Sequence, residues 1–278
     1  NERLMEILIF LDSLKRASAK NVTVIMPYFG YSRQDRKQYS RQPITAKLVA
    51  NLLTVAGANR IVMFDIHADQ IQGFFDIPVD SLSAITVLAR AIKKSKIKNL
   101  IIASPDYGGL TRARSLAKKL TPGASITGID KLRSPNNIKV MNVFGNVKGK
   151  NVIILDDLID TAGTLCMAAS VLKNAGAIEV NAVISHGVLS GPALERIGKS
   201  DLNSLIISNS LPIDTDTKLP KQSAFVSRND SDKYNAAKDG LKKILVISVA
   251  SQIGFAMAAI NNHMSYEALK AKHEEEQK

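Results

Sequence analysis

The sequence is poor in cysteine and in aromatic side chains, and both shortages exclude classes of protein. Cys166 is the only cysteine among 278 residues, so an internal disulfide is impossible, and no Cys/His cluster has zinc-site spacing. Tryptophan is absent and only 5% of the residues are aromatic, so the core must consist mainly of aliphatic side chains. That composition suits parallel strands covered by helices on both faces. We therefore expect a cytoplasmic protein without a structural metal.

A secretory signal and a long hydrophobic run are also lacking. The longest apolar stretch, 244–260, is interrupted by Ser248, Ser251, Gln252 and Gly254. A membrane-spanning helix needs about 20 largely apolar residues. The stretch therefore predicts a buried strand followed by an amphipathic helix, and we expect no membrane partner.

Positive charge is in excess, with a formal net charge of +12 and a pI of about 9.7. Such a balance favours anionic partners, either nucleic acid or phosphorylated small molecules. The densest basic runs, 93–98 and 238–243, do not alternate with aromatic residues as single-strand binders do. We interpret them as solvated faces of helices and expect no nucleic-acid partner.

Short apolar runs rich in β-branched residues alternate with longer stretches of helical periodicity. The predicted strands are 22–26, 60–64, 99–103, 152–155, 180–184, 205–207 and 244–247, and the predicted helices include 46–56, 84–94, 112–120 and 165–175. This alternation is typical of the α/β class, with parallel sheets and crossover helices. Ligands of such sheets bind beyond the carboxyl ends of the strands, so the turns there are the expected site.

The chain is predicted to form two α/β domains that meet near residues 78–83. The first comprises residues 1–82, with the tail 264–278 packing on it, and the second comprises residues 83–263. Within the second, residues 214–243 are polar and lack a firm apolar period. We interpret them as an insertion, partly helical or disordered.

The sharpest motif is the segment 152–164, in which an apolar strand ends in Asp156 and Asp157 and a helix begins near Leu165. Gly163 allows close approach of the backbone to a ligand, and the amides at the helix start form an anion cradle suited to a phosphate. Two acids at this position can accept hydrogen bonds from ribose hydroxyls. A lone acidic pair would more often be an ordinary helix cap.

The whole motif resembles the ribose-phosphate-binding signature shared by phosphoribosyltransferases and phosphoribosyl pyrophosphate synthetases. Five further segments separate these two groups: 26–37, 43–53, 65–75, 104–106 and 185–193. They resemble the ribose-phosphate pyrophosphokinase family in family order, and the resemblance covers about 1–213 and 244–262. It implies two related phosphoribosyltransferase-like domains, each with a parallel-rich sheet flanked by helices. The implied reaction transfers the diphosphoryl group of ATP to the anomeric hydroxyl of ribose 5-phosphate.

The resemblance also assigns residues by matching position. It implies that Lys131 and Arg133 are catalytic residues of a mobile loop, although Leu132 replaces a usual basic residue and Ser134 is extra. It implies Mg²⁺ as the cofactor, with His67 and Asp106 as metal contacts. The ATP-binding residues would be Arg33, Gln34, Asp35 and His67. The ribose 5-phosphate-binding residues would be Asp156, Asp157, Asp160, Thr161, Ala162, Gly163 and Thr164.

The family resemblance further implies a homo-oligomer, usually a hexamer, and roughly ninety more residues upstream of Asn1, within the usual size of a domain. We therefore expect an N-terminally truncated chain whose activity depends on the missing segment. Two alternatives remain open. One is a non-catalytic homologue that assembles with a synthetase, and the other is a phosphoribosyltransferase or a regulator that binds phosphoribosyl pyrophosphate.

Overall fold

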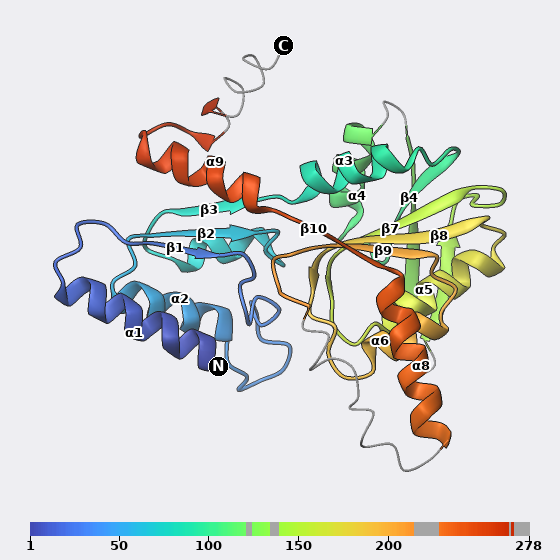
Figure 1. Cartoon of the computed structure of the whole chain (residues 1–278), viewed down its shortest axis with the longest axis horizontal. Helices are drawn as coiled ribbons and strands as arrows, with labels where there is room; N and C mark the ends of the chain where they lie inside the picture. Colours follow the sequence, from blue (N-terminus) through green and yellow to red (C-terminus); the bar gives the residue numbers. More distant parts are fainter. Residues whose placement is uncertain (121–123, 134–138, 214–227, 267, 270–278) are drawn as a thin grey trace. The chain divides into compact units, whose positions relative to one another are not determined.

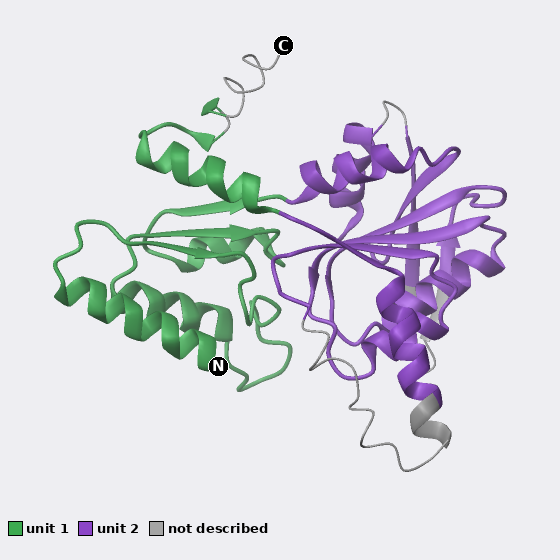
Figure 2. Cartoon of the chain, in the orientation of Figure 1, with its two compact units in different colours: residues 1–83, 249–278 green, residues 84–248 purple. Residues whose placement is uncertain are grey.

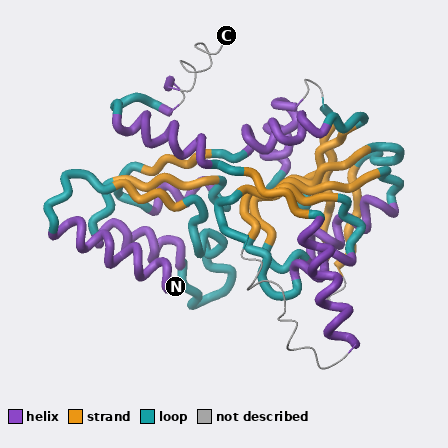
Figure 3. The backbone as a smooth tube through the Cα atoms, in the orientation of Figure 1, coloured by secondary structure: helices purple, strands orange, loops and turns teal. Residues whose placement is uncertain are grey.

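A computed structural model describes residues 1–120, 124–133, 139–213, 228–266 and 268–269 of the chain (Figure 1). The chain divides into two compact units, residues 1–83 with 249–278 and residues 84–248 (Figure 2). Each unit has a sheet between helices (Figure 3). In the described part, no helix is both long and apolar enough to cross a membrane.

The first unit is built on a three-stranded parallel sheet with the order β1-β2-β3. Its elements are α1 (Glu2–Arg16), β1 (Thr23–Met26), α2 (Thr45–Ala56), β2 (Arg60–Phe64), the 3-10 helix η1 (Asp69–Phe74), β3 (Val79–Leu82) and α9 (Ala250–Asn261). Helices α1 and α2 cover one face of the sheet and α9 the other (Figure 1). Aliphatic side chains such as Leu53 and Ile61 are fully buried between these layers, as the composition predicted.

The second unit has a seven-stranded sheet with the order β10-β9-β8-β7-β4-β5-β6, parallel except for the β5–β6 hairpin. The strands are β4 (Leu100–Ser104), β5 (Ser125–Arg133), β6 (Lys139–Phe144), β7 (Asn151–Ile159), β8 (Glu179–Gly187), β9 (Ser204–Ser208) and β10 (Ile244–Ile247). The helices are α3 (Ile85–Ser95), α4 (Leu110–Leu120), α5 (Gly163–Asn174), α6 (Ala193–Lys199) and α8 (Arg228–Lys242). The predicted α/β class, with parallel-rich sheets flanked by helices, is confirmed.

The chain passes between the two units twice, and the second passage lies at a different residue from the one expected. The first crossing lies after Ser83, but the chain returns to the first unit at Val249 instead of at residue 264. The apolar stretch 244–260 does form a strand and a helix, and β10 pairs with β9 while α9 belongs to the other unit. The Gln252 amide of α9 donates to the carbonyl of Ser83 at 2.8 Å. An apolar periodicity shows that a helix is buried on one face, but it does not show which sheet the helix covers.

Several elements have no counterpart among the sequence-based predictions. Strand β3 lies where the boundary between the two domains was expected, and the β5–β6 hairpin and α6 were not predicted. Of the expected insertion 214–243, residues 214–227 lie outside the described residues, while 228–242 form α8. Helix α8 was hard to predict because its sequence is strongly polar, yet Ala237 is buried in the core of the second unit.

Candidate active site

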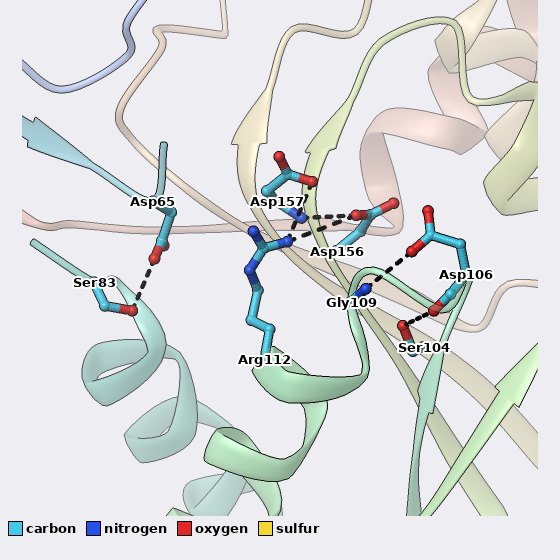
Figure 4. A network of polar contacts seen from close by, with 8 residues as sticks. All are labelled: Asp65, Ser83, Ser104, Asp106, Gly109, Arg112, Asp156 and Asp157. Carbon is cyan, nitrogen blue, oxygen red and sulfur yellow. Dashed lines mark hydrogen bonds and ion pairs between the residues drawn. The ribbon is translucent and has the colours of Figure 1, made fainter. Parts of the chain in front are cut away.

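Two acids stand near the carboxyl end of β7, in the middle of the second sheet (Figure 4). Asp157 is buried, whereas Asp156 is half-buried. The backbone N–H of Asp157 donates to the Asp156 carboxylate at 2.9 Å, which fixes that side chain toward the sheet edge. The apolar residues before them, Val152 to Leu155, are completely buried and anchor the strand, so the acids are held on a rigid support.

Arg112, in the first turn of α4, pairs with both acids (Figure 4). Its Nη1 lies 3.3 Å from Asp157 Oδ1 and 4.0 Å from Asp156 Oδ1, and its side chain is 23% exposed. Arg112 is not among the site residues that the sequence predicted. The available signal was its position, since it opens a helix that follows the carboxyl end of a strand, at the edge where ligands bind.

Asp106 belongs to the turn after β4, which is the strand next to β7. Its carboxylate accepts the backbone N–H of Gly109 at 3.0 Å, and its carbonyl accepts the Ser104 hydroxyl at 2.7 Å (Figure 4). A Cβ at position 109 would lie 2.5 Å from Ser104 Oγ, so a larger residue there would displace the hydroxyl that bonds to the Asp106 carbonyl. The turn therefore presents an exposed carboxylate in a fixed orientation on the same edge as Asp156 and Asp157.

Asp157 and Asp106 both perturb the ionisation of Asp156. The pKa of Asp156 lies well above its ordinary value, first because burial disfavours the carboxylate, and then because Asp157 and Asp106 add negative charge. When folding raises the pKa of a carboxyl group, its protonated form stabilises the folded state at a pH below the unfolded-state pKa. This stabilisation is lost as the pH rises through the folded-state pKa. At neutral pH the ionised Asp156 therefore opposes folding, and Arg112, whose Nη1 lies 4.0 Å away, compensates this charge only in part.

We predict that Asp156→Asn raises the melting temperature of the ligand-free protein at neutral pH. The amide keeps an acceptor for the Asp157 N–H and removes the buried charge, so we expect a gain of roughly 2–4 °C for each kcal/mol of relieved repulsion. Thermal unfolding followed by circular dichroism from pH 4 to 8 measures it, and the gain should shrink toward the acid end.

The control is Asp239→Asn on α8, where an exposed carboxylate bonds to Lys242 at 2.9 Å and has a lowered pKa, chiefly because of that bond. It should leave the melting temperature unchanged or slightly reduced. A loss of stability in Asp156→Asn at every pH would show that the carboxylate is needed for the fold.

The turn between β7 and α5, residues 160–162, is held from several sides. The Ser190 hydroxyl donates to the Asp160 carboxylate, and the Ser190 N–H donates to the Asp160 carbonyl at 3.1 Å. Ala162 is in the left-handed region at φ 61°, which is uncommon for a residue other than glycine. Helix α5 then begins at Gly163, two residues before the predicted start near Leu165, so the first amides of a helix follow this turn.

Arg196 of α6 is the second residue that the sequence did not indicate. Its guanidinium donates to the carbonyl of Thr161 at 2.9 Å, and a Cβ on Gly163 would lie 3.3 Å from Arg196 Nη1. No sequence signal pointed to this contact, because it joins α6 to the β7–α5 turn, more than thirty residues away.

The residues that the resemblance assigned to ATP lie together in the first unit. Arg33, Gln34 and Asp35 follow β1, and His67 follows β2, at the carboxyl edge of the sheet. The Gln70 amide donates to the Asp35 carboxylate at 2.9 Å and joins the two segments. Arg33, Gln34 and His67 are exposed, and Asp65 at the same edge accepts the Ser83 hydroxyl at 2.8 Å (Figure 4).

The positions assigned to catalysis fall at the end of β5. The backbone of Lys131 and Arg133 pairs with Met141 and Lys139 of β6, where the resemblance implied a mobile loop. The side chains of both residues, like the hairpin tip 134–138, lie outside the described part of the structure.

A buried histidine elsewhere at the strand ends has a structural explanation. His186 is 3% exposed, and its Nδ1 lies 2.8 Å from the Ser210 hydroxyl. The turn after β8 therefore contributes no histidine to the exposed edge. Among the residues that the structure describes, no group of three or more His, Cys, Asp or Glu side chains could hold a metal ion.

The second unit has acids and a turn that opens a helix at the carboxyl ends of its central strands, an arrangement that defines a phosphoribosyltransferase-type domain. The model of the phosphoribosyl transferase domain matches residues 79–217. The model of the N-terminal domain of ribose phosphate pyrophosphokinase matches residues 1–57. The chain belongs to the ribose-phosphate pyrophosphokinase family, as the sequence segments indicated.

Individual relatives agree with this assignment. The ribose-phosphate pyrophosphokinase of Bacillus caldolyticus is 53% identical over 222 residues, covering 80% of this chain and 70% of that protein. The enzyme of the same name from Nitrosomonas europaea is 48% identical over 271 residues, covering 97% of this chain and 78% of its own length. The crystal structure of phosphoribosylpyrophosphate synthetase from Mycobacterium smegmatis superposes with a TM-score of 0.79 at 38% identity, covering 94% of this chain and 78% of the other.

Proposed function

We propose that the chain catalyses the ribose-phosphate pyrophosphokinase reaction. The anomeric hydroxyl of ribose 5-phosphate attacks the β-phosphorus of ATP, and the bond between that phosphorus and the α–β bridging oxygen breaks. Phosphoribosyl pyrophosphate and AMP are the products, and the hydroxyl proton is released. The observation that carries the proposal is the acidic edge of the second sheet followed by the β7–α5 turn, in a chain of this family.

Ribose 5-phosphate would bind at this edge of the second unit. Asp156 and Asp157 supply acceptors for the ribose hydroxyls. The phosphate would accept hydrogen bonds from the amides that begin α5 and from the hydroxyls of the flanking threonines, because the start of a helix favours anions. The residues of this phosphate site are Asp160, Thr161, Ala162, Gly163 and Thr164.

ATP would bind at the carboxyl edge of the first unit through Arg33, Gln34, Asp35 and His67. A guanidinium suits both phosphate pairing and stacking on a base. The loops after β1 and β2 are anchored on buried strands, and the Gln70–Asp35 hydrogen bond joins the two loops. Lys131 and Arg133 would counter the charge of the transferred diphosphoryl group.

Mg²⁺ is the expected cofactor, and the residues of this chain fit it. Asp106 is an exposed carboxylate whose charge acts on the neighbouring Asp156, so a divalent cation at this edge would relieve repulsion. Mg²⁺ prefers one or two carboxylates together with substrate phosphates, which matches so sparse a set of protein ligands. The proposed metal contacts are Asp106 in the second unit and His67 in the first, and bound Mg²⁺ would neutralise charge on the polyphosphate.

The test is AMP formation by the purified protein with ATP, Mg²⁺ and ribose 5-phosphate, each omitted in turn. AMP that appears only when all three are present supports the proposal. Binding of phosphoribosyl pyrophosphate without AMP formation would favour a regulator, and consumption of it with a nucleobase would favour a phosphoribosyltransferase. We also expect a homo-oligomer, a hexamer, acting in the cytoplasm, and light scattering measures the assembly.

We predict that Asp157→Asn weakens binding of ribose 5-phosphate much more than binding of ATP. Asp157 is nearly buried at the sugar site and pairs with Arg112, so the substitution removes an acceptor and leaves the guanidinium less compensated. Isothermal titration with each ligand separately measures the two affinities. The reciprocal control is Arg33→Ala, which should weaken ATP more than ribose 5-phosphate. Equal losses for both ligands in Asp157→Asn would place this acid outside the sugar site.

A further inference from the structure

The β7–α5 turn has a conformation that its own sequence does not favour. Ala162 is 4% exposed and adopts a left-handed backbone with φ 61° and ψ 1°, where glycine would be the usual residue. The carbonyl of Ala162 nevertheless accepts the first helical hydrogen bond of α5, from Cys166 N–H at 3.0 Å. Contacts from outside the turn must therefore stabilise this geometry.

Arg196 makes the contact that determines where the amide of the turn points. Its guanidinium donates to the carbonyl of Thr161 at 2.9 Å. The peptide between Thr161 and Ala162 is trans, so its C=O and N–H point in opposite directions. Because the carbonyl is fixed toward Arg196, the Ala162 N–H is directed away from Arg196.

Helix α6, which carries Arg196, is short and is held in place by Lys243, the residue after α8. The ammonium of Lys243 donates to the carbonyls of Ile197 at 3.1 Å, Gly198 at 3.3 Å and Ser200 at 2.9 Å. The Ile197 carbonyl also accepts from the Ser200 N–H and hydroxyl, and a cation is favourable beside the carbonyls at the end of a helix. Lys243 is therefore a cap of α6, although the sequence alone placed it in a solvated basic run.

Helix α8 also packs on α6 at very close range. A Cβ on Gly198 would overlap the carbonyl of Ala236, and a Cβ on Gly240 would overlap the carbonyl of Leu194. The two helices thus cross backbone to backbone. The match to the phosphoribosyl transferase domain ends at residue 217, so α8 and Lys243 lie beyond the matched part of this domain.

We propose that Arg196 is a positioning residue for the ribose 5-phosphate turn, and that residues 232–243 act by holding α6, and hence Arg196, against it. This inference rests on the proposed function and names a device of the same site. It assigns a role to a segment that the family resemblance left unexplained. Arg196 touches no reacting atom in this scheme and acts through the amide of Ala162.

The test compares Arg196→Ala and Arg196→Lys with Lys199→Ala. Lys199 is on the same helix, pairs with Glu195 at 2.7 Å and is 57% exposed, so it is a matched control. We expect Arg196→Ala to raise KM for ribose 5-phosphate about tenfold or more while KM for ATP and kcat change by less than about threefold, because one binding contact is misdirected. Arg196→Lys, which keeps one donor, should recover part of the affinity, and Lys199→Ala should match the wild type.

A second pair tests the support of α6. Lys243→Ala should raise KM for ribose 5-phosphate in the same selective way as Arg196→Ala. Its neighbour Lys242 pairs with Asp239 on the exposed side of α8, so Lys242→Ala should have no effect. Melting temperatures identify variants that fail to fold. If Arg196→Ala fails to fold, the KM for ribose 5-phosphate of Arg196→Lys is compared with that of the wild type instead.

The outcomes separate this inference from the proposed function. If the wild type forms no AMP from ATP and ribose 5-phosphate, the proposed function fails and this inference with it. If the wild type is active but the Arg196 variants keep the wild-type KM for ribose 5-phosphate, only the positioning role is overturned. Equal increases in KM for both substrates would also overturn it, since they would indicate a general loss of structure.

Discussion

Alanine at Lys131 or at Arg133 should lower kcat on the order of 10²-fold or more, with KM for both substrates little changed. Charges that meet the diphosphoryl group only during its transfer stabilise the transition state more than the bound substrates. Their loss therefore affects turnover before it affects binding.

The position of these residues in the fold supports this expectation. Strand β5 pairs with β4 only as far as Gly128, opposite Ser104, and then continues to Arg133 paired with β6 alone. At about 3.3 Å per residue, the last five residues extend roughly 16 Å beyond the end of β4. The end of this arm therefore lies past the strand edge that carries Asp106 and Asp156.

Steady-state kinetics of the two variants, with each substrate varied in turn, gives the result. Leu132→Ala is the control, because Leu132 lies between the two residues and carries no charge, and it should keep most of the turnover. A raised KM with unchanged kcat would assign Lys131 and Arg133 to substrate binding instead.

Gly240→Ala should destabilise the protein by about 1–3 kcal/mol or more, although alanine is the better helix former. In a solvated helix interior the same change stabilises by up to about 1 kcal/mol. Here the added methyl group would overlap the carbonyl of Leu194, so α6 and α8 must separate. The expected sign is therefore opposite to that of the intrinsic propensity.

Gly254 provides the matched control within α9, where a Cβ would meet no atom within 4 Å. Gly254→Ala should leave the free energy of unfolding unchanged or increase it slightly. Urea unfolding of both variants and of Gly198→Ala compares the three positions. Equal stability of Gly240→Ala and the wild type would show that the α6–α8 crossing is looser than described.

Local patterns in the sequence determined the fold class and much of the site. Buried strands such as β2, β4 and β7 are short runs rich in β-branched residues with turns on either side. Both features can be recognised from neighbouring residues in the sequence. For the same reason the acids near the end of β7, the turn before α5 and the turn with Asp106 could be located in advance, although α5 begins at Gly163 and not near Leu165. The roles assigned to these residues in binding and catalysis remain proposals.

Edge elements were predicted less well, because their residues are polar or only partly buried. Strand β3 contains Asp80, which lay in the predicted domain boundary, and this acid pairs with Arg60 of the neighbouring strand at 2.7 Å. The β5–β6 hairpin carries charged residues along an antiparallel arm and lacks the continuous apolar run of a central strand.

The sequence by itself determined which residues stand at the ends of the central strands, since chain order and apolar periodicity place them there. Only the tertiary structure decided what surrounds them. Arg112 reaches Asp157 from α4, Arg196 reaches Thr161 from α6, and Lys243 caps α6 from beyond α8. Each of these contacts joins residues about 35 to 46 positions apart. They depend on how helices pack around a sheet, and no periodicity along the chain records which side chain meets which backbone carbonyl across a packed interface.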